Sequence, residues 1–295
     1  MSSINAPVVL ITGCSSGIGR ALALEFWQQG YCVYATARRV DAIASLQQPG
    51  LNIAQLDVTD TSQITHCLRE IGDQAGKIDL LINNAGYAAV GPLLEMPQSE
   101  VQAQFATNVF APLALIQQVA AHMIEQGSGT IVNIGSASGI LVTPFAGAYC
   151  ASKAALHALS EALRIELAPF NIRVVLVQTG AIQSNIGNAA TERLANTLAK
   201  PSRYETIMDK IRARAMASQQ NATSTETYAQ QLVNDLSKEQ IPAWIVLGHH
   251  SRWLAFLRRW LPQKLRDQIL ITKFGLNLLH PSPPRQQKSP DNDRP

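Results

Sequence analysis

A tyrosine and a lysine four residues apart are the strongest candidates for chemistry in this chain of 295 residues. Tyr149 and Lys153 belong to the run Tyr-Cys-Ala-Ser-Lys, and side chains at this spacing share one face of a helix. A free tyrosine has a pKa of about 10 and is a poor base at neutral pH. A nearby cation favours the phenolate, so Lys153 would make Tyr149 a usable acid or base. The same spacing also occurs by accident on surface helices, so the surrounding elements must decide.

A glycine-rich turn near the start of the chain is a second candidate. The apolar run from Pro7 to Thr12 is typical of a strand buried on both faces, and it leads into Gly-Cys-Ser-Ser-Gly-Ile-Gly at residues 13–19. Glycines let a backbone approach a pyrophosphate closely, and the N-terminus of the following helix offers it free N–H groups. The spacing differs from the general G-x-G-x-x-G fingerprint, so the turn alone is also compatible with a connector that binds nothing.

The end of the second predicted strand carries Arg38 and Arg39 and no acid. In a dinucleotide-binding sheet, a carboxylate at this place binds the ribose 2′-hydroxyl and would repel a 2′-phosphate. Guanidinium groups instead bind phosphate through charge-assisted hydrogen bonds. The sequence therefore predicts NADP rather than NAD. The alternative is that both arginines belong to a solvated surface.

Short apolar strands alternate with helical segments over the first 180 residues. The predicted strands are 7–12, 32–37, 52–56, 79–83, 130–134 and 173–177, and the predicted helices are 17–29, from about 61, 98–126 and 148–168. This alternation predicts an α/β fold with a single doubly wound, Rossmann-type parallel sheet and helices on both faces. Tyr149 follows the fifth strand, where such a sheet carries its ligand crevice, which favours a functional role for the Tyr149/Lys153 pair.

The pattern changes after Gly180. Residues 181–222 are predicted to be helical without a strand, Thr223 begins a capping box ahead of another helix, and residues 241–247 form a last strand. We expect three units along the chain. They are an NADP-binding catalytic domain at 5–250, a basic amphipathic helical extension at 251–280 and a disordered tail at 281–295.

These motifs together resemble the classical short-chain dehydrogenase/reductase family over about residues 5–250. The resemblance is carried by residues 12–19, Asp57-Val58, residues 83–86, Asn108, Ser136 and the Tyr149/Lys153 pair. It implies an NADP-dependent oxidoreductase that interconverts an alcohol and its carbonyl by hydride transfer. Residues 9–19, residues 31–39 and the basic extension are similar to the branch that contains 17β-hydroxysteroid dehydrogenases, retinol dehydrogenases and acyl-dihydroxyacetone-phosphate reductases. This branch implies a lipophilic substrate such as a steroid, a retinoid or a lipid ketone.

The resemblance assigns a role to individual residues. Tyr149 would exchange a proton with the substrate oxygen, and Ser136 would donate a hydrogen bond to that oxygen, with Ser138 as the alternative serine. Lys153 would bind the nicotinamide ribose and lower the pKa of Tyr149, and Asn108 would hold a water in a proton relay behind Lys153. The implied cofactor-binding residues, besides Tyr149 and Lys153, are Gly13, Ser15, Ser16, Gly17, Ile18, Gly19, Arg38, Arg39, Asp57, Val58, Asn84, Ala85, Gly86, Gly180, Ile182 and Ser184.

Two features of the sequence near these residues bear on the ligands. Thr179 stands before Gly180 where the family usually has proline, so this loop lacks the fixed φ of proline. No Arg or Lys occurs between Gly86 and Lys153, and the residues around the predicted site are apolar. A small anionic substrate therefore lacks an obvious partner there, and a lipophilic alcohol or ketone fits. For part of these apolar residues the alternative role is core packing.

Composition and charge limit the remaining classes. With 46% hydrophobic residues, no apolar run of 18 residues and no signal-peptide pattern, the chain is predicted to be globular and cytoplasmic, with its four cysteines reduced and no metal site. Residues 251–295 hold nine Lys or Arg and three Asp, against a net charge of only +3 for the whole chain. The apolar residues Trp253, Phe256, Leu257 and Trp260 share one helix face there.

This face predicts either peripheral contact with an anionic membrane or packing on the catalytic domain or a second subunit. Homo-oligomers are thus one expected assembly, and nucleic acid is not an expected partner. Two functional classes other than an enzyme are also compatible with parts of the sequence. One is a protein that senses NADP(H) without catalysis, and the other is a membrane-surface module. The intact Asn/Ser/Tyr/Lys set favours the enzyme.

Overall fold

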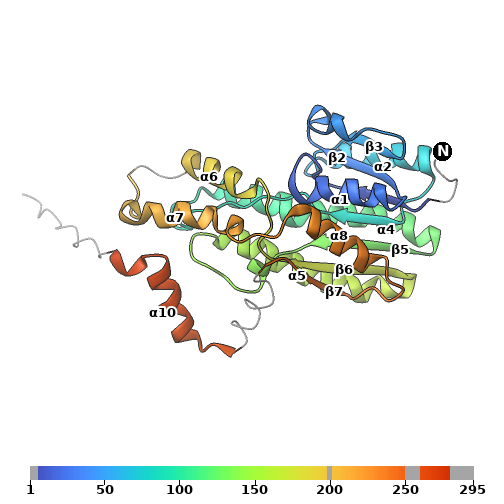
Figure 1. The fold of residues 1–295 in the computed structure, drawn as a ribbon. Helices are drawn as coiled ribbons and strands as arrows, with labels where there is room; N and C mark the ends of the chain where they lie inside the picture. Colours follow the sequence, from blue (N-terminus) through green and yellow to red (C-terminus); the bar gives the residue numbers. More distant parts are fainter. Residues whose placement is uncertain (1–5, 198–200, 250–259, 280–295) are drawn as a thin grey trace, which may run out of the picture.

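The fold is built on one parallel sheet, seen in a computed structural model that describes residues 6–197, 201–249 and 260–279 (Figure 1). The described strands form a seven-stranded sheet in the order β3-β2-β1-β4-β5-β6-β7, and all of its pairs are parallel. The order reverses between β1 and β4, which is the switch point of a doubly wound sheet. The strands are β1 (Val8–Ile11), β2 (Cys32–Ala37), β3 (Leu51–Gln55), β4 (Leu80–Asn83), β5 (Gly129–Ile134), β6 (Ile172–Thr179) and β7 (Trp244–Leu247).

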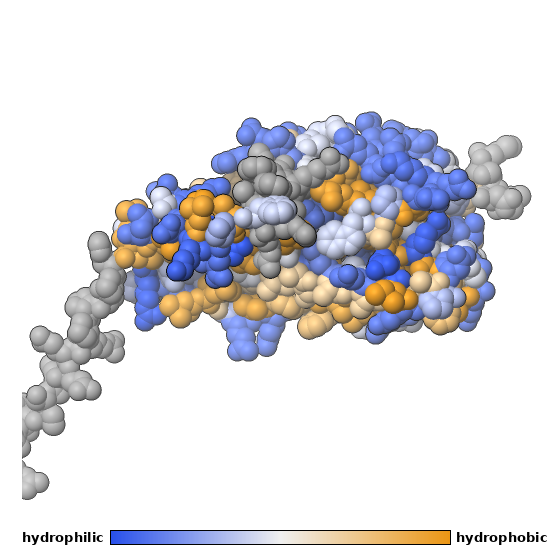
Figure 2. Space-filling model, turned by 90° about the horizontal axis from the view of Figure 1, so that it is seen from below, coloured by the Kyte–Doolittle hydropathy of each residue, from blue (hydrophilic) through white to orange (hydrophobic). Residues whose placement is uncertain are grey.

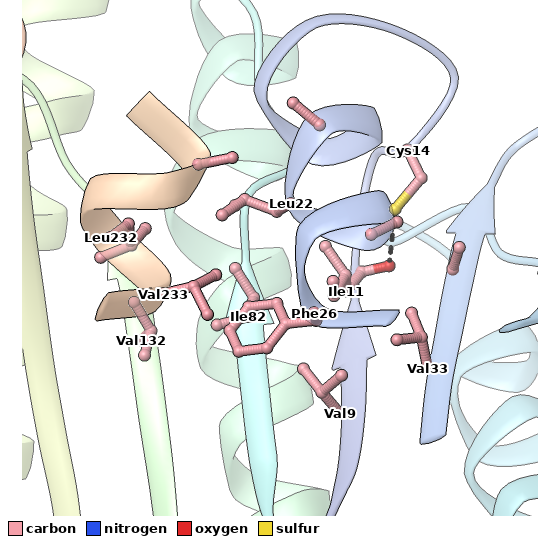
Figure 3. Close-up of a cluster of buried hydrophobic side chains, with 14 of the residues drawn as sticks. Val9, Ile11, Cys14, Leu22, Phe26, Val33, Ile82, Val132, Leu232 and Val233 are labelled. Carbon is pink, nitrogen blue, oxygen red and sulfur yellow. Dashed lines mark hydrogen bonds between the residues drawn. The ribbon is translucent and has the colours of Figure 1, made fainter. Parts of the chain in front are cut away.

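One face of the sheet is covered by α1 (Gly17–Gln28) and α8 (Thr225–Leu236), which pack side by side (Figure 1). Figure 3 shows Phe26 of α1 near Val9 and Ile82 of the strands, with Val233 of α8 beside it. Phe26 and Leu232 are fully buried. Burying a side chain of this size contributes about 1.5–3 kcal/mol, so this layer holds the glycine-rich turn at the start of α1 firmly on the sheet.

The opposite face is covered by α2 (Thr61–Ala75), α4 (Ala111–Gln126) and α5 (Gly147–Glu166). Alternate residues of β1 serve the two faces, because Val8 and Leu10 join this layer while Val9 and Ile11 join the other. Helices on both faces of a parallel sheet confirm the predicted fold class. The predicted strand bounds agree with the structure to within two residues, except that β7 begins at Trp244, three residues later than predicted.

The long helix predicted over residues 98–126 has these bounds in the structure, but it is not a regular α-helix throughout. It consists of α3 (Gln98–Phe105), a π-helical turn at Ala106–Phe110 and α4. Pro112 has no N–H to offer to the carbonyl of Asn108 four residues earlier, so regular α-helical pairing cannot continue through this point. Such π-turns are frequent at functional sites. Asn108 lies inside this one.

A third group of helices stands at the carboxyl ends of the strands and confirms the predicted helical nature of residues 181–222. It comprises α6 (Ile186–Thr197) and α7 (Met208–Ala215), which pack with Phe145 and with Phe274 just after α10 (Gln263–Lys273) (Figure 1). Isolated β-bridges, one of them between Ile182 and Thr223, join the start of residues 181–222 to the chain that follows it. Of the predicted apolar face only Trp260 is described; Trp253, Phe256, Leu257 and the tail at 281–295 lie outside the described residues.

Candidate active site

Tyr149 and Lys153 lie in the first turns of α5, which begins at Gly147 after the loop that follows β5. The Lys153 ammonium is buried and donates a hydrogen bond to the carbonyl of Ile134 at 2.7 Å. This burial lowers the pKa of Lys153 to about 8. A Cβ placed on Gly86 would lie 3.8 Å from Lys153 Nζ, so the segment after β4 passes directly beside the ammonium.

Ser136 is the serine that the structure brings to the tyrosine. It follows β5, and its side chain lies close enough to the Tyr149 hydroxyl to lower the pKa of that phenol. The backbone N–H of Ser138 donates to Ser136 Oγ at 3.1 Å, so Ser138 orients the hydroxyl of Ser136. Burial raises the pKa of Tyr149, opposed by the hydrogen bond from Ser136 and by the charge of Arg214. The effect of Lys153 on this pKa, which the resemblance implies, stays a prediction.

Asn108 connects the π-turn to the segment after β4 and to α5. Its Oδ1 accepts from the backbone N–H of Tyr87 at 3.2 Å, and its Nδ2 donates to the Tyr87 carbonyl at 3.0 Å and to Ser152 Oγ at 3.1 Å. The side-chain amide is thus committed to protein partners. The family resemblance implies a water held behind Lys153. Such a water would have to bind the backbone carbonyl of Asn108, to which Pro112 cannot donate a hydrogen bond.

His157 is a site residue that the sequence analysis missed. It lies one helical turn beyond Lys153 on the same face of α5, and its Nε2 accepts from the backbone N–H of Ser136 at 3.2 Å. Burial, assisted by the nearby charge of Lys153, lowers the pKa of His157 to about 4. The imidazole is therefore neutral at neutral pH, which its role as an acceptor requires. The spacing of Tyr149, Lys153 and His157 in the sequence could have indicated this residue, because steps of four place all three on one helix face.

The glycine-rich turn between β1 and α1 is as tight as its sequence predicts. Gly13 has φ +74° and Gly17 has φ +58°, a region that other residues rarely adopt. A Cβ on Gly13 would lie 2.8 Å from Ala85 Cα, and one on Gly19 would lie 2.4 Å from the carbonyl oxygen of Gly13. The turn therefore accepts only glycine at these points. The predicted residues Ser15, Ser16 and Ile18 lie in the same turn and the first residues of α1.

Asn84 takes part in this turn in a way that differs from its expected contact with the adenosine. Its Nδ2 donates to the carbonyls of Thr12 at 2.8 Å and Gly13 at 3.2 Å. The Thr12 hydroxyl in turn accepts the backbone N–H groups of Asn84 and Ala85, both at 3.0 Å. The segment that begins at Asn84 thus stabilises the glycine-rich turn through hydrogen bonds to Thr12 and Gly13. Thr12 is a second residue whose role the sequence analysis missed.

The two arginines after β2 are not equivalent. Both are exposed, but Arg39 forms an ion pair with Asp41, with Arg39 Nη2 at 2.5 Å from the carboxylate. Arg38 makes no hydrogen bond or ion pair with any described residue, so its guanidinium is available to a phosphate. At the end of β3, Asp57 accepts from Thr59 Oγ1 at 2.7 Å, and Val58 is buried beside it. Asp57, Val58 and Arg38 follow neighbouring strands, as the cofactor prediction requires.

A family model described as short chain dehydrogenase matches residues 7–195. The chain belongs to the short-chain dehydrogenase family. It is 39% identical over 273 residues to a short-chain dehydrogenase, PC-15, of Penicillium crustosum, covering 90% of this chain and 97% of that one. It is 30% identical to the NADPH-dependent 1-acyldihydroxyacetone phosphate reductase of Saccharomyces cerevisiae, covering 97% of each. A solved short-chain dehydrogenase from Streptomyces avermitilis has a TM-score of 0.76 at 30% identity, covering 94% of this chain and 98% of that one.

The loop after β6 of this short-chain dehydrogenase packs against α8, His249 and the glycine-rich turn. Thr179, in the place of the family's usual proline, shares a 2.8 Å hydrogen bond with the buried hydroxyl of Tyr228 in α8. A Cβ on Gly180 would lie 2.3 Å from the carbonyl oxygen of His249, so only glycine fits after Thr179. Ile182 is buried, and Ser184 Cβ would lie 3.2 Å from a Cβ on Gly17. Ser184 therefore faces the glycine-rich turn.

An apolar cavity of about 450 Å³ adjoins the catalytic helix. Its wall includes Leu93 after β4, Leu141 and Thr143 before Tyr149, and Leu270 and Leu276 from the end of the described chain. Gly147, at the start of α5, also lines it. Apart from Arg266 and Asp267 the lining is largely apolar, and it suits an aliphatic chain.

Proposed function

We propose that this protein is an NADP(H)-dependent oxidoreductase that interconverts an alcohol and its carbonyl on a lipophilic substrate. The proposal rests chiefly on one observation, the placement of the Ser136 side chain at the Tyr149 hydroxyl, with the buried ammonium of Lys153 one turn along the same helix. Membership of the short-chain dehydrogenase family supports oxidoreductase chemistry at this constellation. The glycine cradle at Gly13 and Gly19 has the shape that a dinucleotide pyrophosphate needs.

In the reduction of a carbonyl, Ser136, Tyr149 and Lys153 have different roles. Ser136 donates to the carbonyl oxygen of the substrate and stabilises the charge that develops there. Tyr149, whose pKa is raised by burial, keeps its proton at neutral pH and delivers it to the same oxygen. Lys153, held by the Ile134 carbonyl one helical turn after Tyr149, would bind the ribose of the cofactor. NADPH, when bound, supplies the hydride.

The preference for NADP(H) is supported by the charge at the end of β2. Arg38 is exposed and without a protein partner among the described residues, and no acid stands in the place where NAD-dependent enzymes bind the ribose hydroxyls. The yeast relative is named as an NADPH-dependent reductase. Arg39, already paired with Asp41, contributes less.

A lipophilic substrate is supported by the cavity beside α5, whose wall is mainly Leu, Val, Pro and Phe side chains. The direct test is the oxidation of NADPH, followed at 340 nm, with a panel of long-chain ketones, steroids and retinal. We expect turnover with at least one lipophilic carbonyl and slower turnover with NADH. Failure of every carbonyl and every alcohol in both directions, with NADPH still bound, would favour the NADP(H)-sensing alternative.

Helix α10 supports a second proposal, peripheral contact with an anionic lipid surface. Leu265 and Ile269 lie one turn apart and are 46% and 49% exposed, while Lys264 and Lys273 flank them. Figure 2 shows hydrophobic surface mixed with hydrophilic residues at the end of the molecule that carries α7 and α10. Exposed apolar residues next to lysines match the interface of a membrane with anionic headgroups. No helix among the described residues is long and apolar enough to cross a membrane.

A further inference from the structure

Arg214 of α7 reaches across to the loop that precedes the catalytic tyrosine. Its Nε donates a hydrogen bond to Thr143 Oγ1 at 2.8 Å, although the two residues are 71 positions apart. Thr143 lies between Ser136 and Tyr149 in the chain, and Arg214 and Tyr149 interact electrostatically. The sequence showed no cation in this neighbourhood. The fold supplies one from the segment after β6.

This guanidinium has no anionic partner in the described part of the protein. The bond to Thr143 is the only hydrogen bond of its side chain there, and no carboxylate of the described residues pairs with it. Other arginines of the same helical layer are neutralised, because Arg193 pairs with Glu100 and Arg212 with Asp209. Arg214 is also only partly exposed, and its helix neighbours Ile211 and Ala215 are buried.

A partly buried charge without a counterion is costly, and an anion that pairs with it recovers that cost. Burial lowers the pKa of Arg214, which shows the same unfavourable environment for its charge. Only the Nε–H is used by Thr143, so the two terminal nitrogens keep the forked geometry that binds phosphate or carboxylate oxygens. The site is therefore built for an oxyanion.

Thr143 is also part of the wall of the apolar cavity, together with Leu93, Leu141 and Leu270. Arg214 is thus joined through Thr143 to the edge of the cavity, and Tyr149 follows on the same stretch of chain. The charged residues of the cavity wall itself, Arg266 and Asp267, stand next to each other in α10. A ligand that satisfies Arg214, the cavity and Tyr149 carries an apolar chain, a carbonyl and an oxyanion close to that carbonyl. A neutral steroid or retinoid would leave the Arg214 charge unpaired.

We propose that Arg214 is a specificity-determining residue that binds an oxyanion, such as a phosphate monoester, located within a few bonds of the carbonyl of a long-chain substrate. This deepens the proposed function and rests on it for turnover, but the binding contact can be tested separately. It also revises the expectation that an anionic substrate lacks a partner in this site.

The test compares two ketones that differ only in the phosphate, 1-palmitoyl-dihydroxyacetone phosphate and 1-palmitoyl-dihydroxyacetone. For the unmodified protein we expect kcat/KM to favour the phosphorylated ketone by about tenfold or more, the size of a charge-assisted contact. Arg214→Gln should bring the ratio of the two kcat/KM values close to one, and Arg214→Lys should leave part of the preference. Arg212→Gln, an exposed arginine of the same helix, should keep the original ratio. A carboxylate-bearing ketone of equal chain length shows whether phosphate or any oxyanion is preferred.

Three results would overturn the proposal. The first is an unmodified protein that does not prefer the charged ketone. The second is an Arg214→Gln variant with an unchanged ratio of the two kcat/KM values. The third is an Arg214→Gln variant that loses activity toward both ketones equally and has a shifted pH profile. The last would mean that Arg214 acts only through Tyr149.

If no ketone is turned over, calorimetry with 1-palmitoylglycerol 3-phosphate and 1-palmitoylglycerol in the presence of NADP decides instead. Binding that requires both the phosphate and Arg214 would support the proposed contact between them, even though the proposed function fails. Equal binding of the two compounds would reject the contact.

Discussion

His157 Nε2 accepts the backbone N–H of Ser136 at 3.2 Å, which ties the catalytic helix to the loop that carries the serine. His157, Lys153 and Tyr149 follow one another at four-residue intervals along α5, so one helix face carries the phenol, the ammonium and the contact to the Ser136 loop. The contact requires an unprotonated Nε2, because an imidazolium has no acceptor. His157 is therefore a positioning residue whose effect depends on its charge state.

Protonation of His157 should destabilise the protein at acid pH. Its pKa is lowered from 6.5 to about 4 in the folded chain, so between these values the unfolded state binds more protons and stability falls as the pH falls. Lowering the pH from 7.5 to 5 should cost on the order of 2 kcal/mol through this one group. Urea unfolding followed by tryptophan fluorescence at both pH values measures the loss.

The variant His157→Gln should show a smaller loss of stability over the same pH interval, because glutamine does not titrate. The control is His66→Gln, which replaces an exposed histidine of α2 paired with Glu70 and should keep the original pH dependence. If His157→Gln and the unmodified protein lose stability in parallel, the titrating group is another one.

Replacing Tyr149 by phenylalanine should abolish reduction without emptying the cofactor site. The change removes the proton donor and its hydrogen bond with Ser136, so turnover should fall by about two or more orders of magnitude. Binding of NADPH, measured by fluorescence titration, should stay nearly unchanged. Ser136→Ala should also reduce turnover strongly, whereas Ser138→Ala should have a small effect, because Ser138 contributes its backbone N–H to the site. An active Tyr149→Phe variant would refute the assignment.

The strands, the glycine-rich turn and the Tyr149/Lys153 pair could be predicted because their signals are local. A buried parallel strand is an apolar run, and a helix places i and i+4 on one face whatever surrounds it. The four-residue step from Lys153 to His157 was equally local and was overlooked. So was Asp41, two residues after Arg39, which pairs with it.

Other features depend on contacts between distant residues and could not be predicted. Pro112 indicates locally that α-helical pairing fails at Asn108, but the hydrogen bonds from the Asn108 side chain to Tyr87 and Ser152 arise only in the folded chain. Asn84 supports the glycine-rich turn from more than 70 positions away. Arg214 reaches Thr143 from a segment whose polar, alanine-rich sequence carries no signal of its partner.

Arg38 should account for most of the discrimination between NADP(H) and NAD(H). Arg38→Asp removes a contact to the 2′-phosphate and adds a repulsive charge, so the Kd for NADPH should rise by about tenfold or more while NADH binds no worse. Arg39→Ala should have a smaller effect, because Asp41 already pairs with that guanidinium. Fluorescence titration with both cofactors measures these constants. An unmodified protein that binds NADH as tightly as NADPH would contradict the prediction.

The exposed face of α10 should contribute to binding of anionic vesicles. Replacing Leu265 and Ile269 by serine removes the apolar contact without touching Phe274, whose ring packs on Phe145. We expect the full-length protein to sediment with phosphatidylserine vesicles at low salt, and the double variant to bind more weakly, because each buried apolar side chain contributes about 1.5–3 kcal/mol.

The salt dependence and a matched control separate a lipid contact from other uses of this face. High salt should reduce binding of the unmodified protein, since electrostatic attraction contributes on the order of 1 kcal/mol for each lysine or arginine near the surface. Ile165→Ser changes a hydrophobic residue of α5 that is 61% exposed at another place and should leave vesicle binding unchanged. Vesicle binding that is equal in the Leu265/Ile269 variant, together with a change in its oligomeric state by gel filtration, would assign the face to a second copy of the chain.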